Sequence, residues 1–379
     1  MSVVMLNRFS RTVSPISRVV HVSRRMGYGR ARTGESRWLT RRSMSKRPTQ
    51  ADVARSAGVS ATTVSLVLNG RTGTRISDDA ARRVRVAAET LGYSPDPTAL
   101  SLRTGRTKTL GFVSDGVTVT RYASAMIRGV LDAAESKGQS VMMAEVDDHP
   151  DRWERAIVDL SDRKVDAIVV GLMVARTIEL PPMPSGVSTV IVNGLSGGLP
   201  SVLPDEFAAG RAAAEYVIRA GHRRIAFIGR SERMLDPVVS ATVGRRYQGI
   251  DRAMADAGLH FTTTCDLPEW EPGPAREAAM SVLGSPSRPT AILAANDRVA
   301  FGVYQAAADL GLTIAQDVSV MSFDDEALAD YLRPGLTTMR LPYRDMGMAG
   351  VREALNPGND LLELPMPLVE RGSVAPPRG

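Results

Sequence analysis

Residues 47–92 contain three short helical patterns that each end sharply, in a stretch too small for an ordinary enzyme core. The first begins after Thr49, whose hydroxyl can cap a helix, and ends at Gly58; the second begins directly after Ser60. Two helices joined this closely form a helix-turn-helix, whose second helix lies in the DNA major groove. The third pattern begins at Ser77, and its expected buried residues are Ala80, Val84, Ala87 and Leu91.

The second helix is expected to bury Val64, Val67 and Leu68, which leaves its other side to read DNA. Hydroxyls on that side can bond base edges or phosphates, and small apolar side chains can touch a thymine methyl group. The expected DNA-contacting residues of this headpiece are Thr49, Ser60, Ala61, Thr62, Thr63, Ser65, Leu66 and Asn69. The alternative is a small three-helix domain that binds protein, because helix spacing alone is a common pattern.

The segment VARSAGVSATTVSLVLNG, followed by ISDDAARRVRVAAETLGYSPD, resembles the headpiece of the LacI/GalR (lactose-repressor) family of bacterial transcription regulators. The likeness extends from about residue 46 to about residue 372. It implies a headpiece, a hinge that becomes helical in the DNA minor groove, and a periplasmic-binding-protein-like sensor that dimerises.

The charge of the chain is distributed unevenly. Residues 1–43 hold ten arginines and one acid, and residues 44–106 hold ten basic and five acidic residues. Because the whole chain of 379 residues carries +6, residues 107–379 carry −8. Only the N-terminal part is therefore expected to be attracted to phosphates. The length of the chain predicts two or three domains.

The single cysteine, Cys265, excludes an internal disulfide and fits a reducing cytoplasm. The four histidines are scattered, so they offer no metal-ligand cluster. No apolar run approaches the roughly 20 residues that span a bilayer. We expect a cytoplasmic, nucleoid-associated protein with no metal, cofactor or membrane partner.

Residues 1–43 are rich in arginine and serine and lack periodic apolar positions, so they are expected to be unstructured. Three interpretations fit this composition. The segment is a transit peptide, or a basic arm that contacts phosphates, or the result of a start assigned too early, with Met44 as the true first residue. The last is favoured, because Met44 begins a few residues before the first helix, as in the resembling family.

Residues 93–107 form the expected hinge. Asp96 can cap a short helix that begins at Pro97, and the resemblance implies that Leu102 enters a base step of the minor groove with Ala99 in support. Asp96 stands where the family usually has asparagine. Because an acid beside phosphates is unfavourable, this residue is not expected to contact the DNA backbone directly. The alternative is a plain linker that contains proline.

From residue 108 to residue 375 apolar strand patterns alternate with helical ones, which predicts two doubly wound α/β lobes with ligand beyond the carboxyl ends of the strands. Polar residues at those ends, an arginine that precedes a helix, and a tryptophan whose ring suits a sugar face are the candidate effector contacts. The resemblance places effector contacts at three of these positions: Arg245, Asn296 and Asp324. The complete expected set is Arg245, Asn296, Asp324, Trp270, Asn193, Ser114 and Asp115.

An enzyme is the main competing class, and the sequence gives it little support. Adjacent acids on one strand end, Asp324 and Asp325, point to opposite sides, which is poor geometry for catalysis by a carboxylate pair. No Walker A loop, GxSxG elbow or HExxH pattern occurs, and a Ser161-x-x-Lys164 match lacks its companion motifs. A transport-type binding protein would have no use for a headpiece.

These observations predict a homodimeric regulator that is not an enzyme, most simply a repressor, with an all-α headpiece and an α/β sensor. Its partners are an operator in double-stranded DNA and a small effector of carbohydrate type. A corepressor-dependent regulator that senses a nucleobase or another metabolite is the alternative, and a sugar-binding protein or sugar-acting enzyme is a remoter one.

Overall fold

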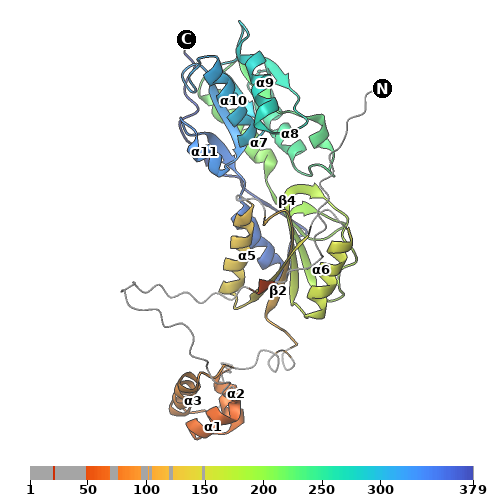
Figure 1. The fold of residues 1–379 in the computed structure, drawn as a ribbon, viewed down its shortest axis with the longest axis vertical. Helices are drawn as coiled ribbons and strands as arrows, with labels where there is room; N and C mark the ends of the chain where they lie inside the picture. Colours follow the sequence, from red (N-terminus) through yellow and green to blue (C-terminus); the bar gives the residue numbers. More distant parts are fainter. Residues whose placement is uncertain are drawn as a thin grey trace, which may run out of the picture. The chain divides into compact units, whose positions relative to one another are not determined.

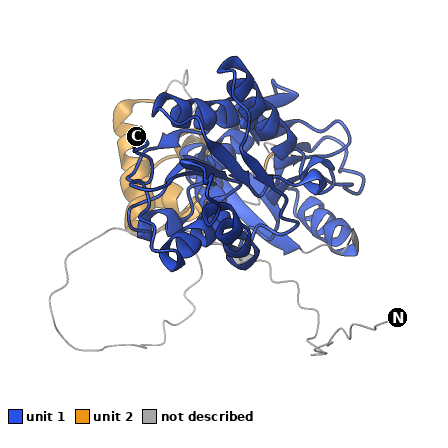
Figure 2. Cartoon of the chain, turned by 90° about the horizontal axis from the view of Figure 1, so that it is seen from above, with its two compact units in different colours: residues 1–22, 109–379 blue, residues 23–108 orange. Residues whose placement is uncertain are grey.

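The structure is a computed structural model that describes residues 20–21, 48–68, 76–94, 101, 105–118, 123–146 and 150–378. The chain separates into two compact units, residues 23–108 and residues 1–22 together with 109–379 (Figure 2). None of the helices in the described ranges has the length and hydrophobicity of a transmembrane span.

The smaller unit contains three helices: α1 (Gln50–Ala57), α2 (Ala61–Leu68) and α3 (Asp78–Leu91). Helix α1 begins with a capping box in which Thr49 and Asp52 bond each other's backbone N–H. It ends at Gly58, whose φ of 65° is the left-handed conformation that stops a helix. Helix α2 begins where Ser60 Oγ accepts from Thr63 N at 3.1 Å. The helix starts inferred from the sequence are present.

The core of this unit departs from the prediction at Leu91. Val53, Val64 and Val84 are fully buried in it, and Ala88 of α3 is buried as well. Leu91 is 36% exposed, because it ends α3 and Tyr93, beyond the turn at Gly92, packs against the core instead.

The first lobe of the larger unit is built on a seven-stranded sheet of order β1-β3-β2-β4-β5-β6-β12. Side chains alternate between its faces: Phe112 packs in one cluster with Met126 of α5, and Val113 packs in another with Trp153 of α6. Figure 1 shows α5 and α6 on opposite faces of this sheet. Its elements are β1 (Val20–His21), β2 (Thr109–Asp115), α5 (Ser124–Ser136), β3 (Ser140–Val146), α6 (Pro150–Asp162), β4 (Ala167–Thr177), β5 (Ser188–Leu195), β6 (Ser201–Pro204), α12 (Tyr343–Leu355) and β12 (Leu361–Leu364).

The second lobe has a six-stranded sheet of order β13-β11-β10-β9-β7-β8. Its helices pack in pairs, α7 with α8 and α9 with α10. The elements are α7 (Glu206–Arg219), β7 (Ile225–Ile228), η1 (Glu232–Leu235), α8 (Val243–Asp256), β8 (Thr263–Cys265), α9 (Pro272–Leu283), β9 (Ala291–Ala294), α10 (Asp297–Asp309), β10 (Ser319–Asp324), α11 (Ala327–Tyr331), β11 (Thr337–Arg340) and β13 (Leu368–Val369). The strands pair in parallel except at β1 and β13, so the predicted α/β class with two parallel lobes is confirmed.

The chain crosses between the lobes three times, which the sequence did not predict. After the first passage into α7, the chain returns from β11 to α12 and β12 of the first lobe, and then enters β13 of the second. Helix α12 completes the cover that α5 begins, and Met126 and Met346 lie in the same buried cluster.

Two residues of the N-terminal extension depart from the expectation that residues 1–43 are unstructured. Val20 and His21 pair antiparallel with Met143 and Met142. Strand β3 lies at the edge of the sheet without them, and an edge strand offers unpaired backbone groups to any segment within reach.

Candidate functional site

Helices α7 and α8 meet at two glycines, and this contact positions the centre of the candidate site. A Cβ at Gly210 would lie 2.2 Å from the backbone oxygen of Arg246, and a Cβ at Gly249 would lie 2.1 Å from that of Phe207. No side chain fits in either place, so the two backbones lie in direct contact. The close approach brings Arg246 of α8 against Glu206, the first residue of α7.

Arg246 is buried, and three of its five N–H donors are bonded to the protein. Its Nε and Nη2 each donate to the Glu206 carboxylate at 2.6 Å, and its Nη1 donates to Ala295 O at 2.6 Å. The guanidinium also lies 4.3 Å from the ring centroid of Phe323. Burial disfavours its charge, but the ion pair with Glu206 outweighs that effect and raises the pKa of Arg246 above its ordinary value.

Asp324 ends β10 beside this pair, with its Oδ1 3.8 Å from Arg246 Nη2. Its carboxylate accepts no hydrogen bond from the described residues. Burial raises the pKa of Asp324 to about 7, with Arg246 opposing the shift and Glu206 adding to it. An acceptor that is nearly buried, and that accepts no hydrogen bond from the described residues, is suited to a ligand.

Asn296 and Asp297 follow β9 in the same region. Asn296 caps α10 by accepting from Val299 N at 2.9 Å. Asp297 is fully buried and accepts from Ser322 Oγ and Thr338 Oγ1, both at 2.8 Å. Burial, and then the charge of Asp324, raise the pKa of Asp297 well above its ordinary value. Asp297 therefore holds the strand ends in place, a role that sequence reasoning missed.

Trp270 presents its ring to the same group of residues. The indole N–H donates to Gly229 O at 2.8 Å, which fixes the ring, and Arg246 lies 5.8 Å from the ring centroid. Trp270, Asn296 and Asp324 are thus brought together around Arg246.

Arg245, the arginine chosen from the sequence, lies outside this group. Its side chain is 42% exposed and pairs with Glu363 of β12 in the first lobe, with Nη2 donating at 3.2 Å. A signal for the neighbouring residue was present: Arg246 shares a helical face with Gly249, Ile250 and Ala253, which are spaced as the buried side of a helix requires. The arginine that lies beside Trp270 and Asp324 is therefore Arg246.

The remaining predicted residues lie at strand ends of the first lobe, and each has at least one polar group bonded to the protein. Ser114 bonds Glu145, Asp115 pairs with Arg176, and Asn193 Nδ2 donates to Leu172 O at 2.9 Å. Asn193 Oδ1 is buried with no hydrogen-bond partner in the described part of the chain.

Two backbone hydrogen bonds join the lobes near these residues. Thr177 N donates to Pro237 O at 2.8 Å, and Ala241 N donates to Ala175 O at 2.7 Å. Because β4 ends at Thr177 and residues 237–241 lead from β7 into α8, the carboxyl ends of both sheets border one junction.

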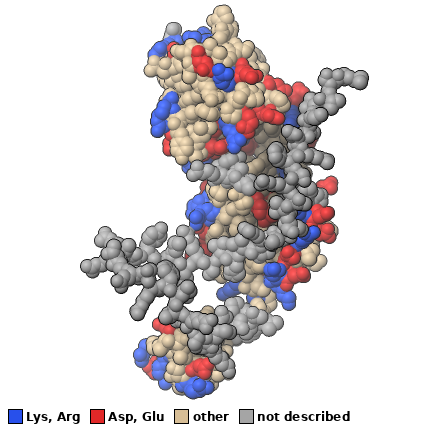
Figure 3. Space-filling model, viewed as in Figure 1, with Lys and Arg blue, Asp and Glu red and all other residues tan. Residues whose placement is uncertain are grey.

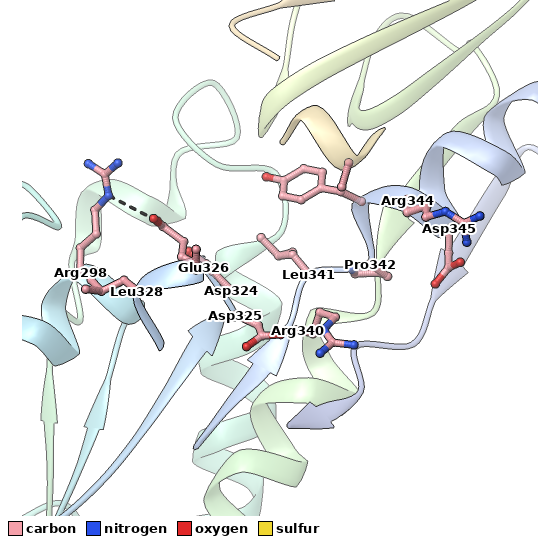
Figure 4. Close-up of a pocket in the computed structure, with 13 residues that line it drawn as sticks. Arg298, Asp324, Asp325, Glu326, Leu328, Arg340, Leu341, Pro342, Arg344 and Asp345 are labelled. Atoms are coloured by element: carbon pink, nitrogen blue, oxygen red, sulfur yellow. Dashed lines mark hydrogen bonds and ion pairs between the residues drawn. The ribbon is translucent and has the colours of Figure 1, made fainter. Parts of the chain in front are cut away.

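A cavity of about 820 Å³ is lined by residues of both lobes, and Asp324 is among them (Figure 4). The labelled side chains around it are largely charged and belong to α10, to the ends of β10 and β11, to α11 and to the crossover into α12. Arg298 donates there to Glu326 at 3.3 Å, and Arg340 donates to Asp325 at 2.7 Å. Asp324 is the one predicted effector residue among those that line this cavity.

The headpiece offers a second candidate surface. Ala61 and Thr62 of α2 are exposed, whereas Thr63, Ser65 and Leu66 are half-buried. Basic and acidic side chains both lie on the surface of this unit (Figure 3), and Arg55 pairs with Asp52 at 3.2 Å. The expected contacts Asn69, Ala99 and Leu102 lie outside the described residues.

Comparisons with known proteins identify both parts of the chain. Residues 49–96 match the model of bacterial regulatory proteins of the lacI family, and residues 214–374 match that of a periplasmic binding protein-like domain. The repressor PurR of Erwinia tasmaniensis is 30% identical over 338 residues, which cover 86% of this chain and 96% of that protein. The chain belongs to the LacI family of bacterial regulatory proteins. The ribose operon repressor of Escherichia coli is also 30% identical, over 86% of this chain and 99% of its own length.

Solved structures of LacI-family proteins share the fold. The lac repressor dimer bound to operator and the anti-inducer ONPF has a TM-score of 0.66 at 22% identity, over 87% of this chain and 100% of that one. A regulator from Rhizobium etli has a TM-score of 0.64 at 28% identity, over 71% of this chain and 100% of that one. The CelR–cellobiose complex has a TM-score of 0.55 at 26% identity, over 86% of this chain and 100% of that one. This LacI-family chain is accordingly a DNA-binding transcriptional regulator, as its sequence predicts.

Proposed function

We propose that this LacI-family regulator is a homodimeric, cytoplasmic repressor whose operator affinity is controlled by a carbohydrate-like effector. In this proposal residues 44–92 read DNA, residues 93–107 form the hinge, and residues 108–375 bind the effector and dimerise. Ligand binding closes or reorients the two lobes and so changes the spacing of the paired hinges. The hinges then lose their minor-groove site, and operator affinity falls.

The observation that carries the effector proposal is the unsatisfied polarity around Arg246. A guanidinium has five N–H donors, and three of them bond Glu206 and Ala295, so one remains on each terminal nitrogen. The Asp324 carboxylate, 3.8 Å away, accepts no hydrogen bond from the described residues. Paired donors and acceptors beside the Trp270 ring suit the hydroxyls and the apolar face of a sugar.

Two relatives agree with a sugar ligand. One is named for the ribose operon, and the CelR structure contains cellobiose. The same ring and the same polar groups also suit a nucleobase, which stacks on aromatic side chains, so this remains the second candidate.

Catalysis is not part of the proposal, because the two adjacent acids do not act as a pair. Arg340 and Arg371 both contact Asp325, at 2.7 and 2.8 Å, and only the Asp324 carboxylate is left for a ligand. A carboxylate pair that acts on a glycosidic bond needs both groups at the substrate.

A thermal-shift screen tests the effector class. A ligand that binds only the native state raises the melting temperature, so pentoses, hexoses, disaccharides, nucleosides and nucleobases are compared with the wild-type protein and with Asp324→Ala. We expect a sugar to raise the melting temperature of the wild type and not of the variant. A rise with nucleobases alone would replace the sugar proposal by the second candidate.

A further inference from the structure

A second cavity, of about 270 Å³, lies at the opposite end of the second lobe from Asp324. Its lining includes Arg224, Thr290 and Val318, which directly precede β7, β9 and β10. The same strands lead at their other ends to Gly229, Ala295 and Asp324. The cavity and the effector site are therefore separated by the length of these strands, roughly 13–20 Å.

Positive charge dominates this cavity. Arg224, Arg288 and Arg378 line it, and Asp317 is the one acidic residue among the lining residues. The Asp317 carboxylate is already engaged, since it accepts from Thr313 N at 2.8 Å and lies 3.5 Å from Arg378 Nη1. It does not neutralise the other two arginines.

The donors of Arg224 and Arg288 remain available. Arg224 Nε approaches Arg288 O at 3.5 Å, which aligns the two segments, and its terminal nitrogens bond nothing in the described structure. The Arg288 guanidinium has neither a hydrogen bond nor an ion pair with any described residue. Both side chains are exposed at the cavity rim, so they are free to close on a ligand.

A buried histidine holds the wall of the cavity in place. His222 is 1% exposed, with Nε2 2.9 Å from Ala375 O and Nδ1 2.9 Å from Thr290 Oγ1. Since a carbonyl oxygen can only accept, Nε2 donates to Ala375. Thr290 Oγ1 also donates to Arg224 O at 3.2 Å, so the threonine links the histidine to the segment that precedes β7. Ser319 Oγ bonds both the N–H and the carbonyl of Ala375 at 3.0 Å. The segment that carries Arg378 is thus fastened to the starts of β9 and β10.

We infer that this cavity is a binding site for a phosphate group, held by Arg224, Arg288 and Arg378. Planar guanidinium groups bind phosphate oxygens in pairs, which makes clustered arginines more selective for this anion than lysines. The volume lies below the roughly 300–1,000 Å³ of pockets that enclose drug-sized ligands, so the ligand is inorganic phosphate or a small phosphorylated metabolite. The site is separate from the proposed effector site and does not depend on it.

Calorimetric titration of the full-length protein tests the inference, with inorganic phosphate and ribose 5-phosphate as probes and chloride at equal ionic strength. We expect both probes to bind the wild type, and Arg224→Ala and Arg288→Ala to weaken binding about tenfold or more. Asp317→Asn is expected to tighten it, because it removes the opposing charge. The probe that binds more tightly identifies the source of the phosphate.

Arg163→Ala is the matched control, because Arg163 is an exposed arginine of the first lobe with the same charge. It is expected to leave phosphate binding unchanged. The affinity for unphosphorylated ribose is expected to be the same in the wild type, Arg224→Ala and Arg288→Ala. The inference is overturned if the wild type binds neither probe. Equal phosphate affinity in the wild type and Arg288→Ala also overturns it, because the anion would then bind elsewhere, such as the cationic N-terminal part. Equal weakening in Arg163→Ala overturns it as well, because binding would then depend on net charge alone.

Discussion

Arg246 and Glu206 form a two-point ion pair, with both contacts at 2.6 Å and both side chains 3% exposed. A buried pair of this kind is weak evidence for stability, but the loss of one partner leaves the other charge uncompensated. The pair also orients the guanidinium toward Asp324. It therefore connects the fold of the second lobe to its proposed ligand chemistry.

We predict that Glu206→Gln destabilises the protein by about 3–5 kcal/mol, because Arg246 stays buried without its counter-charge. The midpoint of urea unfolding measures this. Glu215→Gln is the control, since Glu215 pairs with Arg211 at 2.7 Å on the surface, where such pairs contribute about 0–1 kcal/mol. Equal midpoints for the wild type and Glu206→Gln would contradict the role given to the pair.

The raised pKa of Asp324 predicts a pH-dependent stability. Burial raises it from 3.8 to about 7, so between these values the folded state holds a proton that the unfolded chain releases. The stability contributed by Asp324 is complete below pH 3.8 and is lost as the pH rises through 7. Asp324→Asn cannot ionise, so its unfolding midpoint should rise relative to the wild type between pH 5 and pH 8. A difference that does not vary with pH would show that Asp324 is ionised throughout.

The contact between α7 and α8 predicts that Gly210→Ala separates these helices. The new Cβ would lie 2.2 Å from the Arg246 backbone oxygen, and such overpacking costs about 1–3 kcal/mol. We expect a lower melting temperature and weaker effector binding. Gly273→Ala is the control, because Gly273 has no atom within 4 Å of the added Cβ and should be nearly neutral. Equal melting temperatures in the two variants would refute the close contact.

The exposed position of Thr62 on α2 predicts a loss confined to DNA binding. Thr62→Ala should weaken operator binding in a gel shift while the thermal shift with effector stays unchanged. Thr90→Ala, on the exposed side of α3, is the matched control and should bind operator normally. If Thr62→Ala lowered effector binding as well, the division of labour between the two units would be wrong.

The sequence predicted most of the fold because each element carries its own signal. Thr49, Ser60 and Ser77 mark helix starts, and the continuous apolar runs of β2, β4 and β9 predict buried parallel strands. The return of α12 and β12 to the first lobe was missed, because the order of elements along a chain does not state which sheet each one joins. Leu91 was misplaced for a related reason: a local pattern does not show where a small core ends.

The candidate site was predicted in part. Asn296, Trp270 and Asp324 follow strand ends or lie in a loop, where sequence position and geometry agree. Arg245 was predicted because it is an arginine before a helix, whereas the buried arginine is Arg246. A one-residue step along a helix turns a side chain by roughly 100°, so the two arginines point in different directions. The partners Glu206 and Asp297 come from elements distant in sequence, so no local pattern relates them to Asp324.

The most direct test of the account compares operator affinity with and without the ligand found by thermal shift, in the wild type and in Asp324→Ala. Coupling between ligand and DNA in such proteins typically changes affinity about 5–150-fold. The account predicts a loss of operator affinity of that size in the wild type and no change in Asp324→Ala, which should still bind operator. An equal ligand effect in both proteins, or no preference of either protein for any genomic sequence over random duplex, would contradict it.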